Sequence, residues 1–119
     1  MKAKIEISFW RVVAFLGIAT ELWASSMPGT SVGIPVPWDK VVHGSAFAVL
    51  AFTLCLGAGR WRHRAFWAVP LFIALFAGSD EWHQSFVPGR SCDIKDWIAD
   101  MTGTTLAVVA WWRARAQLD

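Results

Sequence analysis

One stretch decides the fold class of this chain: residues 41–58 read VVHGSAFAVLAFTLCLGA and contain no Asp, Glu, Lys or Arg. This length is close to the ~20 residues that an α-helix needs to cross the ~30 Å hydrocarbon core of a bilayer. Three further apolar stretches of similar length occur along the chain, at residues 9–27, 65–82 and 94–112. The pattern therefore predicts an all-α fold, an integral membrane bundle of four spanning helices.

The composition also indicates a membrane protein. Of the 119 residues, 55% are hydrophobic and 17% are charged, whereas soluble domains average about 45–50% and about 25%. A soluble domain of this size buries only about 60–70% of its chain surface, so it could not hide this much apolar surface from water. The net charge of +2 is too small to indicate a nucleic acid partner. We expect a single domain over residues 1–119, with membrane lipids around it.

The small residues of the predicted spans indicate how the helices pack, and the two cysteines are not expected to form a disulfide. Small residues recur at four-residue spacing, a pattern that lets helix backbones approach closely in lipid, at positions 44 and 48, 74 and 78, and 99, 103 and 107. The two cysteines, Cys55 in an apolar run and Cys92 in a polar one, are expected to be free thiols.

Basic residues divide unevenly between the two sides of such a bundle. Four spans place three Lys and Arg on one side, namely Lys40, Arg90 and Lys95, and the other eight on the side of both termini. Because cytoplasmic flanks are enriched in Lys and Arg, this asymmetry predicts cytoplasmic N- and C-termini. A cleaved signal peptide is the alternative for residues 9–27, although Glu21 lies where such a site should be apolar or small.

The same arrangement of four spans places a set of polar residues at the external face. They are Glu21, Asp39, Lys40, His43, Asp80, Glu81, His83, Gln84, Arg90, Asp93, Lys95, Asp96 and Asp100. Charged groups at this depth are costly and usually face a bundle interior or a wet cavity. They could form a functional site or a salt-bridge network, and Asp39 and Asp93 could each simply cap a helix. Glu81 is rotated by about 100° from Asp80, so both cannot point squarely inward.

Two motifs within this set resemble those of a known family. The run DEWHQSFVPGR at residues 80–90, followed by Asp93, Asp96 and Gly103, resembles the signature of the VanZ-like family. The element D-K-x-x-H at residues 39–43 resembles its upstream motif. Asp100 departs from the pattern, because the family usually has Asn there. The resemblance implies a small bacterial membrane protein of four helices, and the founding member of the family is linked to low-level resistance to the glycopeptide teicoplanin.

We expect the polar residues to form an outward-facing pocket in the cell membrane that binds or modifies a lipid-linked, cell-wall or other anionic molecule. The candidate catalytic residues are Asp80, Glu81 and His43. The candidate ligand-binding residues are Asp39, Lys40, Gln84, Arg90, Asp93 and Asp96. Of these, Lys40 and Arg90 would hold an anionic group. A divalent cation, if there is one, would bind Asp80, Glu81 and Asp96, because carboxylate oxygens suit Mg²⁺, Mn²⁺ and Ca²⁺.

Two other functions stay open from the sequence. In one, the protein is a non-enzymatic scaffold or accessory subunit whose charges form a network that fixes helix register. In the other, it is a transporter, although the inner halves of residues 41–58 and 65–82 offer no polar path. The sequence contains neither H-E-x-x-H nor G-x-S-x-G, so it leaves open whether the protein is an enzyme.

Overall fold

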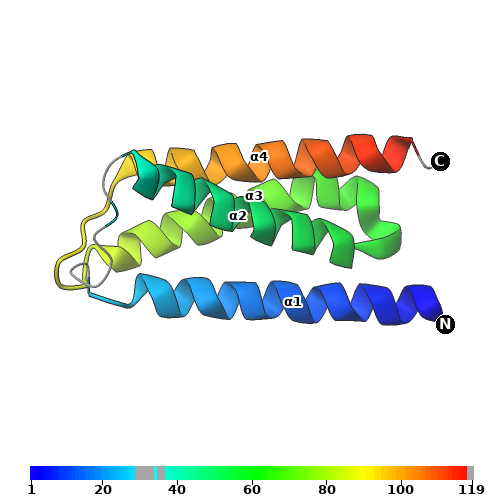
Figure 1. The fold of residues 1–119 in the computed structure, drawn as a ribbon, viewed down its shortest axis with the longest axis horizontal. Helices are drawn as coiled ribbons and strands as arrows, with labels where there is room; N and C mark the ends of the chain where they lie inside the picture. The colour runs from blue at the N-terminus through cyan, green and yellow to red at the C-terminus, as the bar shows by residue number, and fades with distance from the viewer. Residues whose placement is uncertain (29–33, 35–36, 118–119) are drawn as a thin grey trace.

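The computed structural model describes residues 1–28, 34 and 37–117, and within them the chain is helical without any strand. The elements are α1 (Lys2–Ser25), α2 (Trp38–Gly57), the 3₁₀ helix η2 (Gly59–Trp61), α3 (Arg62–Gln84) and α4 (Ile94–Ala116). The prediction of an all-α fold with four helices is confirmed. Successive helices alternate in direction, so the start of α1, the end of α4 and η2 lie at one end of the molecule (Figure 1).

Each of the four helices is longer than the apolar stretch that predicted it. α1 begins at Lys2 rather than at residue 9, and α4 ends at Ala116 rather than at residue 112. Lysine and arginine are good helix formers, so the polar ends of these stretches continue the helix although they lower its hydropathy. The Pro- and Gly-rich residues that follow α1 lie mostly outside the described residues.

The core lies between α2, α3 and α4. Its members include Phe47 and Leu50 of α2, Ile73 and Ala77 of α3, and Val108 of α4. α2 packs most extensively on α4, whereas α1 packs mainly on α2 and buries only Ala14 and Ser25. Figure 1 shows α1 lying along one side of the other helices.

Glycines set the close approach of α2 and α4. A Cβ atom added to Gly103 would lie 1.9 Å from the carbonyl oxygen of Gly44, and one added to Gly44 would lie 3.1 Å from that of Ala99. Only residues without a bulky side chain allow two helix backbones to come this near. The prediction that positions 44, 99 and 103 are packing positions is confirmed.

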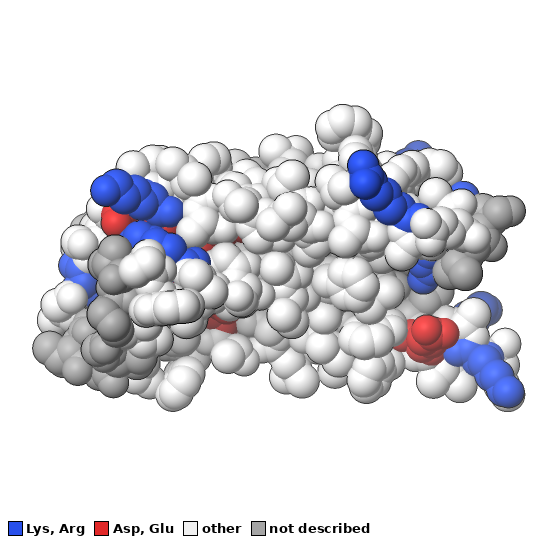
Figure 2. Space-filling view, turned by 45° about the horizontal axis from the view of Figure 1, so that its top comes forward, with Lys and Arg blue, Asp and Glu red and all other residues white. Residues whose placement is uncertain are grey.

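Much of the outer surface of the helices is apolar. Large hydrophobic side chains are more than half exposed on all four helices, for example Phe15, Val49, Leu75 and Leu106. Figure 2 shows charged residues at the two ends of the molecule and an uncharged belt between them. By length and hydropathy, α2 is the one helix in the described part of the chain that qualifies as a candidate membrane span. Charged residues within the other helices lower their mean hydropathy.

Candidate functional site

A polar cavity of ≈ 390 Å³ lies at the end of the molecule opposite the start of α1. Its polar lining comes from all four helices and from the α3–α4 connection, and comprises Glu21, Ser25, Asp39, His43, Asp80, Gln84, Arg90, Ser91 and Asp96. No single motif builds this cavity, because each helix contributes only one or two of its polar lining side chains. The structure thus brings together in space most of the polar residues that the sequence singled out.

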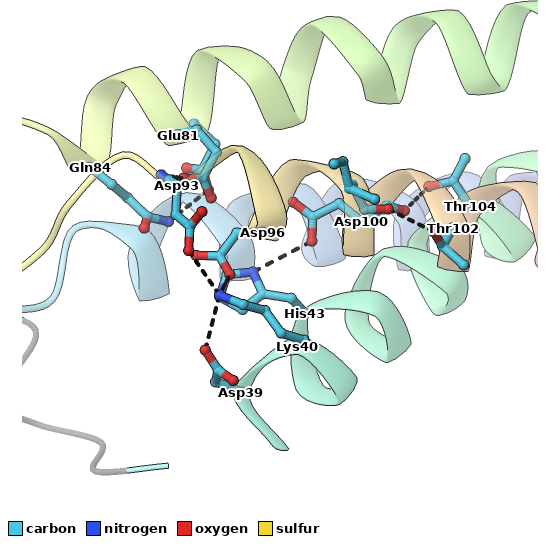
Figure 3. A network of polar contacts seen from close by, with 12 residues as sticks. Asp39, Lys40, His43, Glu81, Gln84, Asp93, Asp96, Asp100, Thr102 and Thr104 are labelled. Carbon is cyan, nitrogen blue, oxygen red and sulfur yellow. Dashed lines mark hydrogen bonds and ion pairs between the residues drawn. The ribbon is translucent and has the colours of Figure 1, made fainter. Parts of the chain in front are cut away.

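Lys40 lies at the centre of a cluster of ion pairs (Figure 3). Its Nζ lies 3.1 Å from Asp39 Oδ2 and 3.2 Å from Asp93 Oδ2, and it also pairs with Asp96 Oδ1. The pairs to Asp93 and Asp96 join the first turn of α2 to the start of α4. An ammonium group has three donors, and three carboxylates take them. The Lys40 ammonium therefore pairs with carboxylates of the protein itself, whereas the sequence led us to expect that it holds an anionic ligand.

Asp93 orders the junction between α3 and α4. It is the N-cap of α4, and its Oδ1 accepts a hydrogen bond of 2.9 Å from the Lys95 backbone N–H. This hydrogen bond, together with the Lys40 ammonium, lowers the pKa of Asp93 from its usual value. The Asp93 backbone N–H in turn donates to Glu81 Oε2 at 3.0 Å. Asp39 is not the N-cap of α2, because that position is Pro37, and no side chain of the described residues makes a cap hydrogen bond there.

Arg90 ties the α3–α4 connection to the end of α1. Its Nε donates to the Met27 carbonyl oxygen at 3.0 Å, and its Nη2 donates to that of Ala24 at 3.2 Å. Carbonyl groups at a helix C-terminus lack helical partners and carry partial negative charge, so a cation is stabilised there. A guanidinium group has five N–H donors. The two hydrogen bonds use two of these donors, and Arg90 also lines the polar cavity.

Asp80 and Glu81 are both buried, although they are adjacent on α3. Asp80 is 6% exposed and Glu81 4%. Their side chains point to different neighbours: Asp80 lines the polar cavity, whereas Glu81 reaches the start of α4. Gln84, one turn further along α3, donates to Asp80 Oδ2 at 3.2 Å. Asp80 Oδ1 is buried and has no hydrogen-bond partner among the described residues.

A second group of side chains comes together from three helices: His43 of α2, Glu81 of α3 and Asp100 of α4. Each offers one ligand atom, and these atoms all lie within 4.8 Å of one another. His43 Nδ1 lies 3.4 Å from Asp100 Oδ1 (Figure 3). An imidazole with two carboxylates is a donor set that can hold a divalent cation.

This group differs from the cation ligands expected from the sequence, namely Asp80, Glu81 and Asp96. Only Glu81 belongs to both sets, because Asp96 pairs with Lys40 and Asp80 faces the polar cavity. The sequence placed Asp100 in the polar set but not among the candidate catalytic, ligand-binding or metal residues, and in the structure it is 2% exposed. Its spacing of four residues from Asp96 was the available signal, since it places both carboxylates on one face of α4.

Comparison with known proteins gives one match. The sequence model of the VanZ/LLP1 family matches residues 5–115, which is nearly the whole chain and includes every residue of the polar cavity and of the His43 group. Neither the curated proteins nor the solved structures give a match. The match agrees with the two motifs at residues 39–43 and 80–90, and the chain belongs to the VanZ-like family.

Proposed function

We propose that the protein is a four-span protein of the cell membrane. The apolar outer faces of all four helices support this proposal, because a monomeric soluble protein rarely exposes contiguous apolar surface of this extent. The molecule is 47 Å long and 23 × 21 Å across, and a bilayer is about 40–45 Å thick with its headgroups. Its charged residues lie at the two ends of that length (Figure 2), where headgroups and water would meet them.

The proposed orientation has both termini in the cytoplasm and the polar cavity on the external side. Its support is the distribution of basic residues. The end of the molecule that carries the start of α1, the end of α4 and η2 holds Lys2, Lys4, Arg60, Arg64, Arg113 and Arg115. An excess of Lys and Arg is the usual mark of a cytoplasmic flank. The polar cavity lies at the opposite end.

The proposed role of the polar cavity is to bind the headgroup of a lipid-linked or cell-wall molecule. The observation that carries this proposal is Asp80, a buried carboxylate that lines the polar cavity and has one oxygen without a hydrogen-bond partner in the described part of the chain. Arg90 lines the same cavity and keeps donors for an anionic group. A ligand that carries an acidic group for Arg90 and a basic or hydroxyl group for Asp80 would pair with both side chains. Membership of the VanZ-like family supports a role in the cell envelope that includes teicoplanin resistance.

The substitution Asp80→Asn tests this role, because it keeps the shape of the side chain and removes its charge. Expressed in a teicoplanin-sensitive Gram-positive bacterium, the unchanged protein should raise the minimal inhibitory concentration of teicoplanin, and Asp80→Asn should not. The matched control is Glu6→Gln, an exposed acid at the other end of the molecule, which should behave like the unchanged protein. Equal resistance from Asp80→Asn would reject the polar cavity as the functional site.

A structural scaffold is the second candidate function, and the three ion pairs of Lys40 favour it. Thermal melting in detergent distinguishes the ligand site from the scaffold. For a ligand site, Asp80→Asn should lose resistance while its melting temperature stays at the level of the unchanged protein. For a scaffold held by these ion pairs, Lys40→Met should lower the melting temperature and the resistance together, whereas Asp80→Asn should leave both unchanged, because Asp80 is in none of these pairs.

A further inference from the structure

Three ligand-type side chains meet at one point beside the polar cavity. His43, Glu81 and Asp100 come from α2, α3 and α4, and their ligand atoms all lie within 4.8 Å of one another. Zinc bonds to nitrogen and oxygen of about 2.0–2.2 Å keep two ligands of one ion no more than about 4.4 Å apart. Small rotations of these side chains are enough to bring the three atoms to that separation.

At this end of the bundle, two carboxylate side chains that are more than nine-tenths buried each have one oxygen without a hydrogen-bond partner among the described residues. These oxygens are Oδ1 of Asp80 and Oδ1 of Asp100, and the two side chains are 6% and 2% exposed. A buried carboxylate without compensation is strongly unfavourable, so such groups are normally paired or bound to a metal ion. Asp100 Oδ1 lies 3.4 Å from His43 Nδ1, which is itself one of the three ligand-type atoms. The two carboxylates therefore still lack a permanently charged positive partner among the described residues.

The basic residues nearby do not supply that partner. Lys40 is taken up by Asp39, Asp93 and Asp96, and Arg90 is turned towards the end of α1. Within residues 1–28, 34 and 37–117, no ion pair joins Asp80, Glu81 or Asp100 to a lysine or arginine.

We propose that His43, Glu81 and Asp100 bind one divalent transition-metal cation, with Zn²⁺ as the fitting probe. An imidazole ligand favours Zn²⁺ over Mg²⁺ and Ca²⁺, which prefer sets made of oxygen alone. The hydrogen bond from the Asp93 backbone to Glu81 Oε2 fixes the orientation of Glu81 and leaves its other oxygen to coordinate. His43 also lines the polar cavity, which gives the cation a route from water. This site does not depend on the proposed headgroup ligand.

Direct metal binding by the whole chain tests the proposal. The protein is purified in detergent, stripped with a chelator, and titrated with ZnCl₂ by calorimetry, with MgCl₂ as the comparison. We expect about one Zn²⁺ for each chain, no displacement by equimolar Mg²⁺, and a higher melting temperature with Zn²⁺. Substituting Co²⁺ should give visible absorption bands that Zn²⁺ removes. Absence of saturable Zn²⁺ and Co²⁺ binding by the folded protein would overturn the proposal.

Variants locate the bound ion. Asp100→Asn and His43→Gln should each weaken Zn²⁺ binding about tenfold or more, because even outer residues of a metal site contribute 10–100-fold. The matched control is His83→Gln, which removes an exposed imidazole at the same end of the molecule, where it contacts Ser26. It should bind Zn²⁺ like the unchanged protein. Unchanged affinity in both ligand variants would refute the assignment, and the Co²⁺ spectrum of the unchanged protein decides the matter if these variants fail to fold.

Discussion

Lys40 and Arg90 show how single basic residues hold this molecule together. Lys40 joins α2 to α4 through Asp93 and Asp96, and Arg90 joins the α3–α4 connection to the carbonyl groups that end α1. Arg11 acts in a similar way at the other end, where its Nε donates to the Gly57 carbonyl oxygen at 3.0 Å. Each of these side chains connects elements that are distant in sequence, so each contributes to the relative position of two helices.

Replacing Lys40 with Met should destabilise the protein, because it leaves three carboxylates facing one another without a cation. The melting temperature in detergent should fall by about 5 °C. The matched control is Lys95→Met, a lysine at the same end of the molecule whose side chain is exposed, and it should change the melting temperature little. Thermal unfolding followed by circular dichroism gives both values. Equal melting of both variants would show that the Lys40 ion pairs do not stabilise the fold.

At the scale of the helices, the pairing of α2 with α4 depends on small residues. Gly44, Ala99 and Gly103 let these two backbones touch, and this contact places His43 beside Asp100. α3 completes the core from the other side and adds Glu81. The approach of α2 and α4 is therefore a condition for the His43 group to form.

Gly103→Ala should disrupt this pairing. The new Cβ would lie 1.9 Å from the carbonyl oxygen of Gly44, and a backbone atom of a packed helix cannot move aside without separating the helices. Overpacking of this kind costs about 1–3 kcal/mol or more. The control is Gly78→Ala, whose Cβ would lie at an ordinary 3.7 Å from Trp97 Nε1. Melting in detergent should separate the two variants, and a Gly103→Ala protein as stable as the control would contradict the packing described.

The charges of the whole molecule lie at its two ends, with an uncharged belt between them (Figure 2), and most of the acidic residues lie at one end. That end carries Glu21, Asp39, Asp80, Glu81, Asp93, Asp96 and Asp100, and the other end carries most of the lysines and arginines. In a membrane, this division would fix the direction in which the bundle inserts.

The two native cysteines allow a test of this direction. Cys92 is exposed near the polar cavity and Cys55 is buried, so Cys55→Ala leaves Cys92 as a single reporter. A membrane-impermeant maleimide should label it in intact cells. A second protein with Cys55→Ala, Cys92→Ser and His63→Cys should be labelled only after the cells are opened. The reverse result would overturn the proposed orientation.

The sequence by itself determined the number and type of the elements and the family. Apolar stretches of helix length are local properties, and so are the small residues at four-residue spacing and the motifs at residues 39–43 and 80–90. Each of these can be recognised without knowing how the helices are arranged. The sequence also assigned the polar residues to one end of the bundle, because successive membrane-spanning helices alternate in direction.

Only the tertiary structure decided which side chains meet. Neighbouring residues on a helix differ by about 100°, so the rotation and tilt of each helix select its partners, and these depend on packing between distant segments. Glu81 thus joins His43 and Asp100 rather than Asp80 and Asp96. Lys40 is surrounded by carboxylates, and Arg90 finds carbonyl oxygens that are left over at the end of α1. Free backbone acceptors of this kind arise from helix ends in space, and no side-chain motif records them.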